Sequence, residues 1–180
     1  ELALTGSFGF WATAGLLAAL AAPLQAQDLK VRIGLSSPLS GGQASNGQDN
    51  RDGALLAINQ LNAKGIMVGQ KKLQFELAAQ DDGADPRQGV TVAQGMADAK
   101  INFVLGPYNS GVAIPVSRVY NDAGIVVATV ASNPQVTQQN HARLFRVGAS
   151  DLQLGAKMAV YAAKELKIAT VAVVDDRTSY

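Results

Sequence analysis

The stretch GPYNSGVAIPVS, residues 106–117, follows the apolar run FVL at residues 103–105. The apolar run predicts a buried strand, and the apolar spacing after Gly111 predicts a helix. Between them lies a loop of small and hydroxyl-bearing residues that includes Ser110. In α/β proteins such a loop joins the carboxyl end of a strand to the free amides of a helix, where ligands commonly bind. The stretch therefore predicts an α/β fold, and the rest of the sequence must indicate which ligand, if any, binds at this loop.

Elements of the same two kinds alternate on both sides of this loop. Short strands separated by long helices require crossover connections, so we expect a parallel sheet with helices on both of its faces. An amphipathic helix before Gly65 follows the first strand, and that glycine is the expected helix end. The other expected elements are strands at residues 31–35, 73–79, 103–105 and 125–129 and helices at residues 86–99 and 111–122.

The last third of the chain predicts a new series of elements. Residues 144–149 are strand-like but less apolar than the earlier strands. They lead into a helix at residues 152–166, for which Ser150 or Asp151 is the expected cap. A further strand is expected at residues 170–174, shortly before the sequence reaches its last residue.

The N-terminal stretch predicts export. Residues 8–24 read FGFWATAGLLAALAAPL without a charge, and the chain turns polar after Ala26. This is the pattern of a secretory signal peptide, residues 1–26, and it is too short and alanine-rich for a comfortable membrane span. Because the chain begins with Glu1 and has no basic segment, we expect the natural start to be missing. The alternative, a buried N-terminal helix, fits less well because the apolar residues cover every face.

Composition narrows the range of functions. The chain has 15 Lys plus Arg against 14 Asp plus Glu, so no general field attracts nucleic acid, and no nucleic-acid partner is expected. It has no cysteine, which excludes a disulfide framework, a thiolate metal site and a cysteine nucleophile. The first strand leads into SSPLSG rather than Gly-x-Gly-x-x-Gly, which disfavours a nucleotide-dependent enzyme. No cofactor is expected.

No metal site is expected either. Asp81, Asp82 and Asp85 lie close together, but the distal Glu that a calcium loop needs is absent. We interpret them as strand-end and helix-cap residues. His141 has no second His or Cys to share a metal ion with it.

Five short strings carry a specific resemblance. They are VRIGLSSPLSG at residues 31–41, INQLNAKG at 58–65, DDGADP at 81–86, GPYNS at 106–110 and ASNP at 131–134. Together they resemble the periplasmic leucine/isoleucine/valine-binding protein family, the type I substrate-binding proteins of branched-chain amino acid ABC transporters. The resemblance covers nearly all of the chain from Asp28 to Tyr180.

The resemblance implies a two-lobed α/β protein that closes on a small solute. Residues 27–147 would form lobe one, and residues 148–180 would form the hinge and the start of lobe two. Family members cross between their lobes more than once, so we expect the natural protein to continue beyond Tyr180. After removal of the signal peptide the protein would be periplasmic and would not span the membrane.

The chemistry of an amino acid head group assigns a role to the opening loop. A zwitterion needs donors for its carboxylate and acceptors for its ammonium group, because an unpaired desolvated charge is costly. Ser110, with its hydroxyl at a helix N-terminus, suits the carboxylate. The alternative is that Ser110 only caps its helix.

The resemblance extends the site to four more residues. It implies that Ala131 gives a backbone carbonyl to the ammonium group and that Ser132 donates to the carboxylate or accepts from the ammonium. Tyr180 aligns with a tyrosine that covers the ligand at the mouth of lobe two. Asn46 stands where the leucine-type proteins have a tyrosine, and its amide suits a polar ligand side chain. Ser132 could instead be simple turn chemistry.

The expected function is capture of an amino acid, or of a related small polar solute such as an amide, and its delivery to an ABC transporter permease. A ligand that contacts both lobes would stabilise the closed form, which the permease can distinguish by shape. We expect no catalysis, because no nucleophile with a base is evident. The alternative is the ligand-binding ectodomain of a receptor, or an amide- or urea-sensing regulator of the same fold. The ligand itself stays open among leucine-type and other amino acids, amides, urea and aromatic acids.

Overall fold

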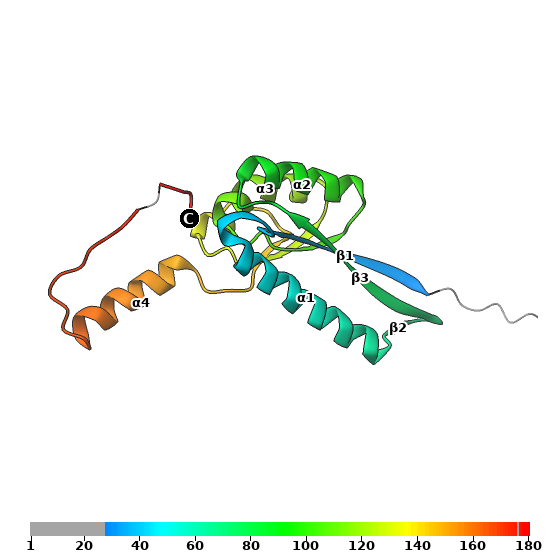
Figure 1. Ribbon diagram of the computed structural model, residues 1–180, viewed down its shortest axis with the longest axis horizontal. Coiled ribbons are helices and arrows are strands. Elements are labelled where there is room, and N and C mark those ends of the chain that lie inside the picture. The colour runs from blue at the N-terminus through cyan, green and yellow to red at the C-terminus, as the bar shows by residue number, and fades with distance from the viewer. Residues whose placement is uncertain (1–27, 176) are drawn as a thin grey trace, which may run out of the picture.

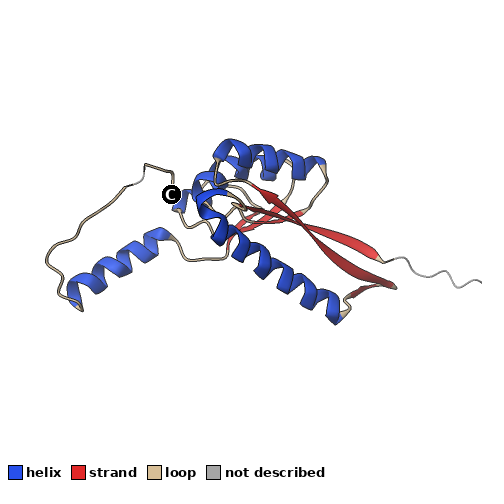
Figure 2. Ribbon diagram, in the orientation of Figure 1, coloured by secondary structure: helices blue, strands red, loops and turns tan. Residues whose placement is uncertain are grey.

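A six-stranded sheet forms the centre of the computed structural model, which describes residues 28–175 and 177–180 (Figures 1 and 2). The strand order is β2-β3-β1-β4-β5-β6, and the five strands from β3 to β6 in this order run parallel. The strands are β1 (Leu29–Ser37), β2 (Met67–Val68), β3 (Lys71–Asp81), β4 (Phe103–Leu105), β5 (Val126–Thr129) and β6 (Leu144–Arg146).

Helices lie on both faces of this sheet, as the sequence predicts. Helix α1 (Ala44–Lys64) covers one face, and helices α2 (Pro86–Asp98) and α3 (Ser110–Asp122) lie together on the other (Figure 1). Gly65 ends α1 in the left-handed conformation, with φ of 65°, and Asp85 caps α2 by accepting from the amides of Arg87 and Gln88. Two short 3-10 turns, η2 (Gly41–Gln43) and η3 (Pro134–Val136), complete the loops.

The expectation of a wholly parallel sheet is wrong at one edge. Strand β2 pairs with β3 in antiparallel fashion, Met67 opposite Lys72 and Val68 opposite Lys71. Only Gly69 and Gln70 connect the two strands, and so short a connection permits a hairpin but no crossover. The run of apolar residues in β2 is too short to predict a strand from the sequence.

The expected strand at residues 170–174 is absent from the structure. Residues 165–175 follow helix α4 (Asp151–Lys164) without pairing to a strand, and Val173 and Val174 are 90% and 92% exposed. A strand requires a neighbour for its backbone hydrogen bonds, and the described residues provide none here. Helix α4 begins at Asp151, and its N-cap residue is Ser150, one of the two residues expected there, but the Ser150 side chain makes no capping bond. Figure 1 shows α4 standing away from the sheet.

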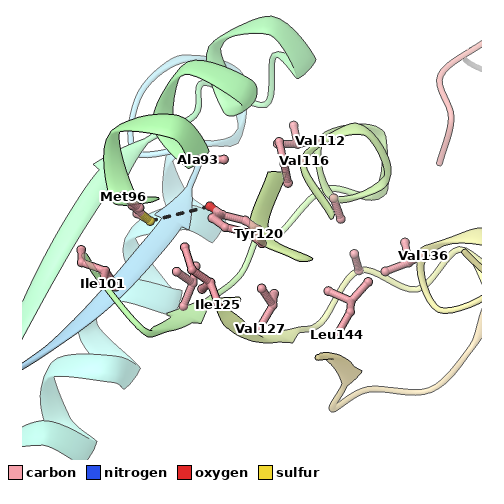
Figure 3. Packing of buried hydrophobic residues seen from close by; sticks show 13 residues of the cluster. Ala93, Met96, Ile101, Val112, Val116, Tyr120, Ile125, Val127, Val136 and Leu144 are labelled. Carbon is pink, nitrogen blue, oxygen red and sulfur yellow. Dashed lines mark hydrogen bonds between the residues drawn. The ribbon is translucent and has the colours of Figure 1, made fainter. Parts of the chain in front are cut away.

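The main hydrophobic core lies between the sheet and the helices α2 and α3 (Figure 3). Met96 and Tyr120 are its largest buried side chains, and the Tyr120 hydroxyl donates to the Met96 sulfur at 3.6 Å. Full burial of a large apolar side chain such as that of Met96 contributes about 2 kcal/mol. The other members are Ala93, Ile101, Val104, Val112, Ala113, Val116, Ile125, Val127, Ala131, Val136 and Leu144.

The strand register places the carboxyl ends of four strands at one edge of the sheet. Ser37 at the end of β1 pairs with Asp81 of β3, and Leu35 pairs with Leu105 at the end of β4. Leu105 in turn pairs with Ala128 near the end of β5. The loops that follow these strands therefore emerge side by side, which is where parallel sheets usually bind ligands.

Candidate ligand-binding cleft

A cleft of about 810 Å³ opens at this edge of the sheet. Residues that follow β1, β3, β4 and β5 line it, together with residues 177–180. Figure 1 shows the C-terminal end of the chain beside these loops. The lining residues of the cleft are Gln43, Asn46, Ala84, Pro86, Tyr108, Asn109, Ser110, Gly111, Val130, Ser132, Arg177, Thr178, Ser179 and Tyr180. Arg177 is the one charged side chain among these described residues.

Ser110 is the first residue of α3 and is only 1% exposed. The carbonyl of Asn109 already accepts from the amides of Val112 and Ala113, at 3.1 and 2.8 Å. The amides of Ser110 and Gly111 are therefore the ones at the helix start without an intrahelical acceptor. They are suited to an anion, because the helix dipole is positive at this end.

A hydrogen bond joins Ser110 to the loop after β5. The backbone amide of Asn133 donates to the Ser110 Oγ at 3.2 Å. A hydroxyl that accepts a hydrogen bond in this way still has its own hydrogen to donate. The two loops that the sequence singles out thus meet directly, with the hydroxyl group between them.

Thr129, at the end of β5, connects the same two loops by hydrogen bonds on their buried side. Its hydroxyl donates to the carbonyl of Pro107 at 2.6 Å and accepts from the amide of Ala131 at 3.0 Å. The side chain is completely buried, so water cannot replace either bond. Thr129 is a positioning residue for the cleft.

Asn133 connects the cleft loop to two other parts of the chain and also stabilises the turn that follows it. Its carbonyl accepts from the Arg146 guanidinium at 3.1 Å, and its side-chain oxygen accepts from the amide of Gln135 at 2.9 Å. Its side-chain nitrogen donates to the carbonyl of Ser179 at 2.8 Å. Next to it, the carbonyl of Ser132 accepts from the amide of Asp151 at 3.0 Å. Residues 179–180 and the start of α4 are thereby attached to the cleft.

Two neighbouring carboxylates hold the loop after β1. Asp81 accepts from the amides of Leu39 and Gly83, both at 2.8 Å, and a hydrogen bond from the Ser40 side chain is the main reason that the Asp81 pKa lies below its ordinary value. Asp82 is fully buried and accepts from the Ser36 hydroxyl at 2.7 Å, but burial raises its pKa. These bonds confirm that the aspartates serve as strand-end residues.

The direction of the Asp81 pKa predicts a specific acid sensitivity. Because the folded carboxyl binds its proton less tightly than the unfolded one, its stabilising effect is present above the ordinary pKa of 3.8 and is lost as the pH falls through the lower folded value. Asp81→Asn should lower the free energy of unfolding at pH 7 by no more than about 1 kcal/mol, since the group is near solvent. Denaturant unfolding of both proteins between pH 2.5 and 7 measures this. A difference that stays constant over the whole range contradicts the assignment.

The structure brings four of the five predicted site residues to the cleft. Ser110, Ser132, Asn46 and Tyr180 all line it, and Tyr180 is 73% exposed at its opening. Ala131 is not a lining residue, because its side chain is buried in the core beside the cleft. The ligand contact of the Ala131 carbonyl stays a prediction.

Sequence reasoning missed several residues of the cleft. Tyr108 and Asn109 lie in the opening stretch beside Ser110, so their position alone could have included them. Gln43 and Arg177 also line the cleft, but nothing in the local sequence distinguishes them from ordinary surface residues. They reach the cleft only because the fold brings distant parts of the chain together.

A mainly parallel sheet with helices on both faces and a polar cleft at its carboxyl edge is typical of α/β domains that bind small solutes. The pattern of the family described as periplasmic binding protein matches residues 30–180. The chain belongs to this family, in agreement with the resemblance to leucine/isoleucine/valine-binding proteins.

Comparison with known proteins gives the same answer. The chain is 39% identical over 170 residues to the Leu/Ile/Val-binding protein BraC3 of Rhizobium johnstonii. The aligned region covers 93% of this chain and 45% of BraC3. Among solved structures, an ABC transporter substrate-binding protein from Desulfitobacterium hafniense in complex with Leu is similar, with a TM-score of 0.66 and 30% sequence identity. The superposed region covers 76% of this chain and 39% of that protein's chain. The chain spans less than half the length of the curated relatives it matches.

A third relative shows the fold alone. The branched-chain amino acid transporter substrate binding protein LivJ of Streptococcus pneumoniae, in complex with isoleucine, has a TM-score of 0.70 at 23% identity, covering 77% of this chain and 39% of its own. The predicted fold class, type I periplasmic binding protein, is confirmed. In the described part of the chain, none of the helices combines the length and the apolar character of a membrane span. The predicted signal peptide, residues 1–26, lies outside the described residues.

Proposed function

We propose that the protein binds the head group of a free amino acid in this cleft and delivers the amino acid to the permease of an ABC transporter. The observation that carries the proposal is the hydrogen bond from the Asn133 amide to the Ser110 hydroxyl. This bond brings the loops after β4 and β5 together at the cleft. Polar groups of these loops that have no hydrogen-bond partner are costly to leave so, and a polar ligand would supply the partners.

Each charged part of the head group has partners of the right kind. The carboxylate accepts from the Ser110 hydroxyl and from the amides at the start of α3, where the helix dipole favours an anion. Arg177 adds a positive charge to the cleft lining. The ammonium group donates to the Ala131 carbonyl and to the Ser132 hydroxyl. The protein binds its solute without altering it.

Residues 148–180 belong to the moving part in this proposal. They form the hinge and the start of a second lobe, and residues 27–147 form the first lobe. The bond from Asn133 to the Ser179 carbonyl and the place of Tyr180 at the cleft opening support this division. A ligand held by both parts stabilises the closed form, which the permease then distinguishes from the empty one. Residues 1–26 direct the protein to the periplasm.

The test is a calorimetric titration of the full-length protein with a panel of L-amino acids. We expect at least one to bind, and we expect Ser110→Ala to weaken its binding about tenfold or more, because the carboxylate loses a hydrogen bond in a shielded site. Blocking the carboxylate of the same amino acid as its amide should remove most of the effect of the substitution.

The matched control is Ser45→Ala, since Ser45 is exposed on α1 and does not line the cleft. It should leave the affinity unchanged. The proposal fails if no amino acid binds to the wild-type protein, or if Ser110→Ala binds as tightly as Ser45→Ala.

A further inference from the structure

Arg146 is a half-buried cation that does not line the cleft. It is the last residue of β6 and pairs with Thr129 of β5. Side chains alternate between the two faces of a strand, so Arg146 lies on the same face as Leu144, which belongs to the hydrophobic core. None of the ion pairs between the residues that the structure describes includes Arg146. A charge on this face of the sheet is costly unless a polar partner offsets the cost.

The polar partner of Arg146 is the backbone of the loop after β5. The Arg146 Nη1 donates to the carbonyl of Asn133 at 3.1 Å. The amide of the same residue donates to the Ser110 Oγ at 3.2 Å. The Asn133 side chain is engaged elsewhere, because it accepts from the amide of Gln135 and donates to the carbonyl of Ser179. Arg146 is therefore linked to the Ser110 hydroxyl through the backbone of a single residue.

The bond from Arg146 restricts the direction of the Asn133 amide. Only two soft torsion angles separate the amide of a residue from its carbonyl, and in Asn133 they are φ of −59° and ψ of 131°. While the carbonyl is held, the amide has little freedom to turn away from Ser110. The Ser110 hydroxyl that accepts from this amide keeps its own hydrogen for the ligand carboxylate. A donor that is oriented in advance binds more tightly than one that must first be ordered.

We propose that Arg146 is a positioning residue for the head-group site. Through the Asn133 backbone it fixes the Ser110 hydroxyl in the orientation that donates to the ligand carboxylate. The inference rests on the proposed function, because it takes the carboxylate to be bound at Ser110. It deepens that function by assigning part of the affinity to a residue that does not touch the ligand.

The first test removes the guanidinium. Arg146→Met keeps much of the apolar length of the side chain and loses the donor. We titrate the full-length protein by calorimetry with the L-amino acid that the wild type binds most tightly in the panel. We expect Arg146→Met to weaken binding about fivefold or more, because a hydrogen bond from a charged donor is lost. Arg146→Lys keeps the charge and a donor for this single bond, so it should restore most of the affinity.

The matched control is Arg143→Met, which removes an arginine directly before the same strand. Arg143 is exposed, and its side chain makes no hydrogen bond or ion pair with any residue that the structure describes. This substitution should leave the affinity unchanged. Thermal unfolding of each variant checks that it folds. Arg146→Gln takes the place of the methionine variant if that variant does not fold, because its shorter side chain loses the bond but keeps a polar end in this half-buried place.

A double-mutant cycle distinguishes positioning from a general effect on the fold. If Arg146 acts through the Ser110 hydroxyl, Arg146→Met should weaken binding by less than about twofold once Ser110 is alanine. A residue that only stabilises the fold would lower the affinity equally in both backgrounds. Hydrogen exchange of the ligand-free protein gives a second measurement, in which the Asn133 amide should exchange faster in Arg146→Met than in Arg143→Met.

The outcomes separate this inference from the proposed function. If Arg146→Met binds as the wild type does, or weakens binding equally with and without the Ser110 hydroxyl, the inference is overturned while amino acid binding stands. Unchanged exchange of the Asn133 amide in Arg146→Met overturns it as well. If the wild-type protein binds no amino acid, the proposed function fails and the inference fails with it.

Discussion

Gly47→Ala is expected to destabilise the protein by about 3 kcal/mol, even though alanine is the better helix former. Gly47 lies in the first turn of α1, where a Cβ atom would stand 1.9 Å from the carbonyl oxygen and 2.5 Å from the carbonyl carbon of Pro38. The Pro38 backbone cannot simply move away, because the next amide, that of Leu39, is bonded to Asp81. The helix and the loop would have to separate, which costs more than the gain in helix propensity.

Gly53→Ala is the matched control in the same helix. No atom lies within 4 Å of the position that its Cβ would take, so the substitution should stabilise the protein by up to about 1 kcal/mol. Denaturant unfolding of the two variants and the wild type measures both changes. Two changes of the same sign would show that the close contact at Pro38 has no energetic importance.

The two glycines also separate stability from ligand binding. Gly47 fixes the start of α1, and this turn carries Asn46 to the cleft, with Gln43 directly before it. Gly47→Ala should therefore weaken ligand binding even at temperatures where the variant is folded. Gly53→Ala, farther along the helix, should leave binding unchanged.

The elements near the cleft could be predicted from the sequence because their signals are local. The run at residues 103–105 is apolar, the loop after it is small and polar, and Pro86 and Gly65 mark the start and the end of helices. Such signals act over a few residues and do not depend on distant parts of the chain. They place Ser110 at a helix N-terminus without any knowledge of the fold.

The pairings between distant residues could not be predicted in this way. Strand β2 exists because a two-residue turn brings it against β3, and residues 170–174 stay unpaired because no described strand lies beside them. The Asn109 side chain donates to that of Gln43, 66 positions away, and either amide alone is ordinary loop chemistry. The sequence indicates the loops of the site, whereas the contacts between the loops depend on the register of the sheet.

Thr129→Val is expected to lower the free energy of unfolding by about 2–4 kcal/mol, although valine has nearly the same shape as threonine. The substitution removes the hydroxyl that donates to the Pro107 carbonyl and accepts from the Ala131 amide. Both backbone groups are then left without that partner in a buried place, and each such loss costs about 1–3 kcal/mol. Denaturant unfolding measures the change. Thr91→Val, at an exposed site on α2, should change stability by no more than about 0.5 kcal/mol.

Thr129→Ser separates the hydroxyl from the shape of the side chain. Serine keeps both hydrogen bonds and loses only a methyl group, so it should cost about 1 kcal/mol, less than valine does. Because Thr129 fastens the loops of Ser110 and Ser132 from the buried side, Thr129→Val should also weaken amino acid binding, and Thr129→Ser should bind nearly as the wild type does. If valine instead proves closer to the wild type than serine, in stability or in affinity, packing rather than hydrogen bonding holds these loops together.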